Sequence, residues 1–82
     1  MAVNELDRDY LKMVHNCDTI LNIINGRKLQ DGTEEEKKGQ VGNIIMVVEM
    51  ELLDDKYTTA GKDLSYINET ITQGRTYWQG SD

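Results

Sequence analysis

The side chains best suited to chemistry in this chain are one imidazole and one thiol, those of His15 and Cys17. A zinc site usually needs about four such ligands, so one chain cannot supply a full set. On a helix these two side chains point about 160° apart, which places Cys17 in an apolar face and His15 in solvent. A buried cysteine without an oriented base also lacks the activation that nucleophilic catalysis needs. We therefore expect no enzyme activity, no metal and no cofactor.

Two short motifs match known binding patterns only in part. Gly39-Gln40-Val41-Gly42 has the spacing of a G-x-x-G loop that clamps nucleic-acid backbone, but flanking strands and a basic surface are missing. It also lacks the Lys-Ser or Lys-Thr of a phosphate-binding loop, so we predict that its glycines allow close helix packing. The triplet Asn68-Glu69-Thr70 resembles a glycosylation site but lies in a predicted helix, and we discount it.

Acidic residues form two groups near the two ends of one predicted helix. The first group is Glu34, Glu35 and Glu36, and the second is Glu49, Glu51, Asp54 and Asp55. One interpretation is a solvated surface that keeps an aliphatic bundle soluble. The other is mimicry, in which carboxylates spaced like phosphates fill the basic groove of a nucleic-acid enzyme. The spacing does not fit a calcium loop, so we expect no metal here either.

The totals limit the class of protein. Nine basic and fifteen acidic residues give a net charge of -6, which opposes direct binding to nucleic acid. Eighty-two residues form one domain whose stability alone would be marginal, so association would help. With no Phe and few aromatic residues, we expect an aliphatic core. A single cysteine and the lack of a basic-apolar leader predict an intracellular protein, and no window is apolar enough to cross a membrane.

The first predicted helix covers residues 5–25. Asn4 can cap its start, and Glu5 and Asp7 lie in the first turn, where the helix dipole favours negative charge. Apolar residues then recur at spacings of three and four for about five turns. They are Leu6, Tyr10, Met13, Val14, Cys17, Ile20, Leu21 and Ile24. Asn25-Gly26 predicts the stop, followed by Arg27 and Lys28 where positive charge suits the exposed carbonyls.

The second predicted helix covers residues 34–53 and opens with a capping box, Thr33-x-x-Glu36. Its second half is apolar on nearly its whole circumference. One side carries Val41, Ile44, Ile45, Val48 and Leu52, and the opposite side carries Met46, Met50 and Leu53. Two arrangements fit this pattern: the other helices cover both sides, or they cover only the first and leave a Met-rich patch for a partner. The scarcity of aromatic residues favours association.

The third predicted helix covers residues 60–79, after a turn at 56–61 and with Thr58 or Thr59 as its N-cap. One narrow side of this helix is expected to face the core. It consists of Leu64, Ile67, Ile71, Gly74 and Trp78. Tyr66 and Tyr77 fall beside this row, so we expect them at its border with their hydroxyls in water, or as part of a second contact surface.

The row Asp63-Leu64-x-x-Ile67-Asn68-x-x-Ile71-x-x-Gly74-x-x-Tyr77 resembles a pattern in small helical proteins of tailed bacteriophages, particularly those of marine cyanobacteria. The resemblance covers about a fifth of the chain and carries over no functional residue. It implies a small phage protein, made in the cytoplasm of an infected bacterium or built into the virion. Two roles would then be natural: a virion structural or assembly component, or an inhibitor of a host protein.

Together these patterns predict an all-α protein, a small antiparallel three-helix bundle that acts by protein–protein contact. The first hypothesis is a virion structural or assembly component that forms a homo-oligomer through a surface of Met46, Met50 and Leu53, with Tyr66 and Tyr77 as further contact residues. The alternative is an acidic inhibitor that binds a basic groove of a host nucleic-acid enzyme or defence protein through the two acidic groups.

Overall fold

The computed structural model of this protein describes residues 4–26 and 32–79, which form four helices and no strand. They are α1 (Glu5–Ile24), α2 (Glu34–Leu52), α3 (Lys56–Thr59) and α4 (Ser65–Gln79). The all-α class predicted from the sequence is therefore confirmed. The predicted connection at Arg27 to Asp31 and the chain end after Gln79 lie outside the described residues.

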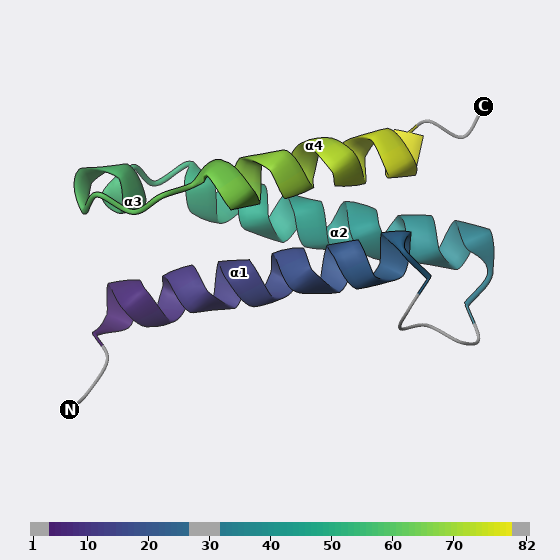
Figure 1. The fold of residues 1–82 in the computed structure, drawn as a ribbon, viewed down its shortest axis with the longest axis horizontal. Helices are drawn as coiled ribbons and strands as arrows, with labels where there is room; N and C mark the ends of the chain where they lie inside the picture. The colour runs from purple at the N-terminus through teal and green to yellow at the C-terminus, as the bar shows by residue number, and fades with distance from the viewer. Residues whose placement is uncertain (1–3, 27–31, 80–82) are drawn as a thin grey trace.

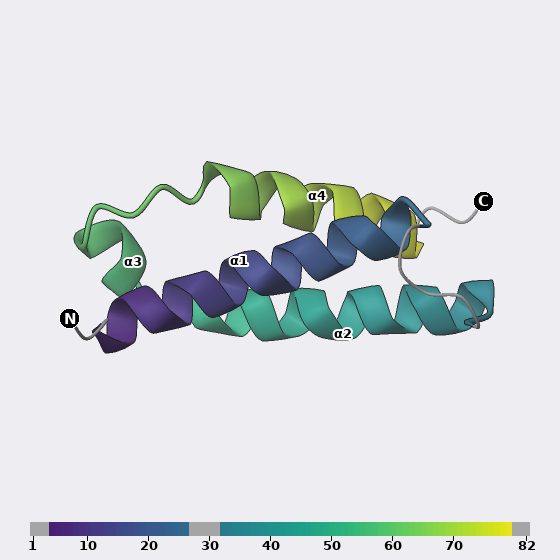
Figure 2. The same cartoon turned by 60° about the horizontal axis from the view of Figure 1, so that its bottom comes forward.

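The three long helices lie along a common axis. In Figure 1 the chain runs from left to right through α1, returns through α2 and runs from left to right again through α4. Each long helix packs against the other two, and short α3 packs against α1. The turned view in Figure 2 shows α3 at the end of the molecule where α1 begins and α2 ends.

Local capping fixes the start of both α1 and α2. The Asp7 backbone N–H donates to the side-chain oxygen of Asn4 over 2.8 Å, and the capping box of α2 joins Thr33 and Glu36 through two bonds of 3.0 Å. Such caps satisfy backbone N–H groups that have no partner within the helix. The first helix ends at Ile24, one residue before the predicted Asn25, and Gly26 follows with a φ of 70°.

Helix α2 is continuous through both of its glycines. At Gly42 an added Cβ would lie 2.8 Å from Nε1 of Trp78 on α4, so the indole ring rests directly on the backbone. At Gly39 an added Cβ would meet nothing within 4 Å. The prediction that a neighbour packs closely against the helix is thus confirmed at Gly42 and wrong at Gly39.

The segment before α4 differs most from the prediction. Instead of a helix from residue 60, the chain forms α3, passes through Gly61 at a φ of 79° and begins α4 at Ser65. Neither Thr58 nor Thr59 caps α4, because both lie within α3. The carboxylate of Asp63 accepts a hydrogen bond from the backbone N–H of Ser65 over 2.9 Å and so holds the first turn of α4.

The core lies between the three long helices and is closed at one end by α3. Its buried apolar residues are Met13, Cys17, Ile20, Ile23, Val41, Ile45, Val48, Tyr57, Ile67 and Ile71. The expected aliphatic core is therefore wrong in one respect, since the largest fully buried side chain is the aromatic ring of Tyr57. Tyr57 comes from α3, in the segment that the sequence pattern assigned to a turn.

Gly74 lies at the closest approach of α4 to its neighbours. A Cβ at this position would lie 2.9 Å from Cδ1 of Ile45 and 3.2 Å from Cγ2 of Ile20, so side chains from both α2 and α1 occupy the space. Trp78, expected on the same buried row, is instead 45% exposed. The indole covers Gly42 at the edge of the bundle and leaves part of its ring in solvent.

The two glycine environments predict opposite effects of alanine. Gly74→Ala should lower the free energy of unfolding by up to about 2 kcal/mol, because overpacking of Ile45 and Ile20 costs more than the gain of ~1 kcal/mol from alanine in a helix. Gly39→Ala should raise it by about 0.5 to 1 kcal/mol, because alanine favours an exposed helix and meets no neighbour. Urea unfolding followed by circular dichroism measures both. An equal gain from both variants would contradict the close packing at Gly74.

Candidate protein-interaction surface

The outer side of α2 carries four of the large exposed apolar side chains of the described residues. Met46, Val47, Met50 and Leu53 are 57%, 55%, 65% and 80% exposed, and we call this set the α2 surface. On the inner side Val41, Ile45 and Val48 are buried against α1 and α4. Of the two arrangements that fit the sequence, the chain adopts the one in which its own helices cover only the inner side.

The sequence pattern missed Val47. Its position on α2 lies between the two predicted apolar sides, so periodicity assigned it to neither. In the structure it extends the α2 surface next to Met46. Because Met46 and Met50 beside it are also exposed, Val47 belongs to one continuous patch.

The α2 surface is hollowed. A shallow pocket of about 420 Å³ is lined by Met46, Glu49, Met50, Leu52 and Leu53. A second hollow of about 370 Å³ shares Met46 and Glu49 with the first and extends to Gly42, Arg75 and Trp78. The two hollows together form a groove along α2 whose far side is made by α4. Its lining is mostly apolar, which suits a protein partner better than a polar ligand.

One ion pair crosses the edge of this groove. The Arg75 guanidinium of α4 contacts the Glu49 carboxylate of α2, and both side chains are partly exposed. The pair cancels the single charge that α2 places between Met46 and Met50. The middle of the α2 surface is therefore nearly neutral despite the net charge of -6.

Most of the predicted acidic patch has partners within the chain. At the start of α2, Glu34 accepts a hydrogen bond from the Tyr77 hydroxyl over 2.8 Å, and Glu36 belongs to the capping box, while Glu35 is exposed. At the other end Glu51 accepts from the Tyr57 hydroxyl, Asp54 accepts from a backbone N–H, and Asp55 is exposed. Because the two acidic groups lie at opposite ends of α2, they form no single row.

The structure does not bring Tyr66 and Tyr77 to the α2 surface. Tyr66 on α4 donates its hydroxyl to the Asp18 carboxylate on α1, and this bond raises the pKa of Tyr66 to about 12. Burial, followed by the bond to Glu34, raises the pKa of Tyr77. Both residues join helices of the same chain, and Glu34 lies about 18 Å along α2 from Met46.

Cys17 and His15 lie as their positions on the helix predicted. Cys17 is fully buried, and burial raises the pKa of its thiol from 9.0 to about 11 although a hydrogen bond with Thr70 acts in the opposite direction. His15 is exposed on the other side of α1. Within residues 4–26 and 32–79, no three His, Cys, Asp or Glu side chains come together in a way that could hold a metal ion.

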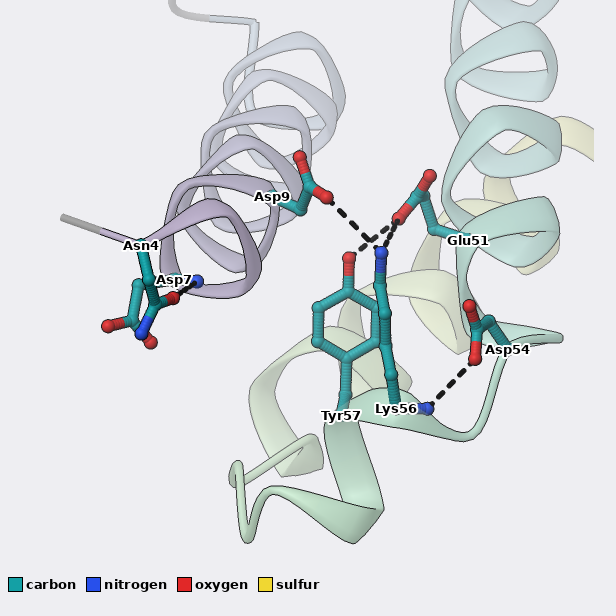
Figure 3. Close-up of polar contacts among 7 residues, drawn as sticks. All are labelled: Asn4, Asp7, Asp9, Glu51, Asp54, Lys56 and Tyr57. Atoms are coloured by element: carbon teal, nitrogen blue, oxygen red, sulfur yellow. Dashed lines mark hydrogen bonds and ion pairs between the residues drawn. The ribbon is translucent and has the colours of Figure 1, made fainter.

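A polar cluster around α3 fixes the end of α2 beside the α2 surface (Figure 3). The Tyr57 hydroxyl donates to Glu51 over 2.6 Å, and burial followed by this bond raises the pKa of Tyr57 to about 12. The Lys56 ammonium donates to Asp9 of α1 over 3.2 Å, which raises the pKa of Lys56. The Lys56 backbone N–H donates to Asp54 over 3.1 Å. These bonds hold the last turn of α2 against α1 and α3.

No protein-family model, curated protein or solved structure matches this chain. The resemblance to phage proteins stays a prediction. In the described part of the chain, none of the helices combines the length and the apolar character needed to cross a bilayer.

The buried tyrosine predicts a loss of stability in alkaline solution. Because the folded chain raises the pKa of Tyr57 from 10.0 to about 12, the neutral phenol contributes stability fully below pH 10 and loses it as the pH approaches 12. Over this range the free energy of unfolding should fall less steeply for Tyr57→Phe than for wild type. Urea unfolding at several pH values measures the slopes, and equal slopes would mean that Tyr57 does not contribute.

Proposed function

We propose that this chain is a non-enzymatic, antiparallel three-helix bundle that acts by protein–protein contact and binds a second copy through the α2 surface. The observation that carries the proposal is the exposure of four large apolar side chains, grouped on one side of one helix. Groups of this kind on a folded protein mark interaction sites more often than single exposed residues do. The two methionines suit such a site because their unbranched side chains adapt to a partner.

The energetics favour weak, concentration-dependent association. Burying a large apolar side chain fully contributes about 1.5 to 3 kcal/mol, so covering the exposed part of these four contributes about 4 to 8 kcal/mol. The loss of free motion on association costs about 4 kcal/mol or more. Apolar side chains on the second copy add to the gain. A weak contact that is repeated in an assembly of many copies suits a structural or assembly component.

The resemblance at Asp63 to Tyr77 supports a source for such a component. We propose a virion structural or assembly protein, located in the infected bacterial cytoplasm or in the virion. The alternative role, an acidic inhibitor of a host enzyme, has less support. Glu34, Glu49 and Glu51 bind partners within the chain, and a basic groove would have to compete with those bonds.

Self-association predicts that a charge within the α2 surface separates the copies. Met50→Asp places a carboxylate at the centre of the apolar patch, where burial against a partner would cost the charge its hydration. We expect the variant to be monomeric and helical at concentrations where wild type associates. Analytical ultracentrifugation over a concentration series measures the mass, and circular dichroism measures the helix content.

A matched control separates the effect of this site from that of net charge. Gln73 is exposed on α4, in a polar stretch beside Asn68, Glu69 and Thr72. Gln73→Asp adds the same charge and should associate like wild type. A wild-type chain that stays monomeric at every concentration, or a Met50→Asp variant that associates normally, would overturn the proposed function.

A further inference from the structure

The outer side of α1 carries a second exposed patch of opposite character. Leu11 is 58% exposed, although most large aliphatic residues that the structure describes are at least partly buried. The side chains around it form a shallow hollow, which is lined by Arg8, Leu11, Lys12, His15 and Asn16. We call this set the α1 face. It combines one apolar side chain with a group of basic residues in a chain whose net charge is -6.

Two acidic residues of α1 pair with lysines outside the α1 face. Between Glu5 and Asp18 the sequence contains only two acids, Asp7 and Asp9. Asp7 pairs with Lys62 over 2.6 Å, and Asp9 pairs with Lys56 over 3.2 Å. Both pairs lie on the sides of α1 that contact α3 and the segment before α4. The α1 face is thus lined by basic side chains, and Glu5, one turn before Arg8, is the acid on the same side of the helix.

The α2 surface has the complementary character. Its hollow is apolar and has room for a leucine side chain. The exposed Asp54 and Asp55 follow Leu53 at the end of α2, where exposed carbonyls make the helix dipole negative. Cations are favoured at such an end. The basic α1 face therefore matches the α2 surface in both its apolar and its charged parts.

We propose that the α1 face of one copy docks on the α2 surface of the next, with Leu11 in the hollow and with Lys12 and His15 opposite Asp54 and Asp55. This inference rests on the proposed self-association and names the partner surface. The contact joins two different surfaces, so each copy offers one of each and can bind a neighbour on either side.

A symmetric contact between two α2 surfaces is the competing arrangement. It would bury the methionines of both copies, but it would place no cation of α1 opposite Asp54 and Asp55. Like charges that meet at an interface oppose association, whereas opposite charges speed and orient it. The charge distribution therefore favours the α1 face as the occupant of the α2 surface.

A mixing experiment tests this contact. Leu11→Asp removes the α1 face and keeps the α2 surface, and Met50→Asp does the reverse. Each variant alone should be monomeric, with self-association weakened by about tenfold or more. Mixed in equal amounts, the two should form a one-to-one dimer through the one intact pair of surfaces. Its affinity should lie within about threefold of the wild-type contact, because neither substitution lies in that contact.

The outcomes separate this inference from the proposed function. If Leu11→Asp self-associates like wild type while Met50→Asp is monomeric, the proposed function stands and the α1 face is not the partner surface. If both variants are monomeric and their mixture is too, the contact between the two surfaces is likewise refuted. Normal association of Met50→Asp alone overturns the proposed function itself.

Two controls keep the test decisive. Gln73→Asp should self-associate like wild type, which excludes an effect of net charge. If circular dichroism shows that Leu11→Asp loses helix, Lys12→Glu replaces it, because glutamate is a good helix former at an exposed site. Lys12→Glu should weaken self-association by about threefold or more, but it should bind Met50→Asp within about threefold of the wild-type contact, because that pair joins two intact surfaces. Wild-type affinity for Lys12→Glu would refute the charged part of the contact.

Discussion

Too much of α2 is apolar for two neighbouring helices to cover. In an arrangement where each long helix packs against the other two, every helix keeps one outer side in solvent. On α4 that side is polar, with residues such as Thr72 and Gln73. On α2 it carries Met46, Met50 and Leu53, so the sequence gives this one helix an apolar side that the fold does not use. Burying it would require another chain.

The fold compensates for its few aromatic residues by bringing helices close together. Gly74 lets α4 approach Ile20 and Ile45, and Gly42 lets the Trp78 ring lie on the backbone of α2. Close approach increases dispersion contacts between aliphatic side chains, which is how a small core gains stability without large rings. The one large ring inside, Tyr57, closes the end of the bundle and directs its hydroxyl to Glu51 at the border. That bond connects core packing to the end of α2 where the α2 surface lies.

Features that depend on neighbouring residues could be predicted from the sequence. The Asn4 cap and the Thr33–Glu36 capping box are formed by residues three apart, so their patterns are sufficient. The burial of Cys17 likewise follows from a single helical periodicity. The start of α4 could not be predicted. Residues from other helices hold Tyr57 in the core, and this contact determines where the segment around Tyr57 lies. Local propensity in residues 56–64 does not contain that information.

The candidate site shows the same division. Periodicity separated Met46 and Met50 from Val41 and Val48, but whether another helix covers the second side depends on how α1 and α4 sit around α2. By residue type alone, Tyr66 and Tyr77 could be interface tyrosines. In the structure their hydroxyls instead donate to Asp18 and Glu34 across helix contacts. A tyrosine beside an apolar row can therefore join helices or meet a partner, and only the three-dimensional arrangement distinguishes the two.

The packing of α1 against α2 would determine what association through the proposed surfaces can build. Helices α1 and α2 pack directly against each other and share one buried core, so no flexible linker separates the α1 face from the α2 surface. A contact between two different surfaces on a rigid unit repeats the same rotation at every step, and the repetition closes into a ring or continues as a filament. The crossing of α1 and α2 would set that rotation. The same side chains that stabilise the monomer, such as Cys17 and Val48, would thus also set the geometry of the assembly.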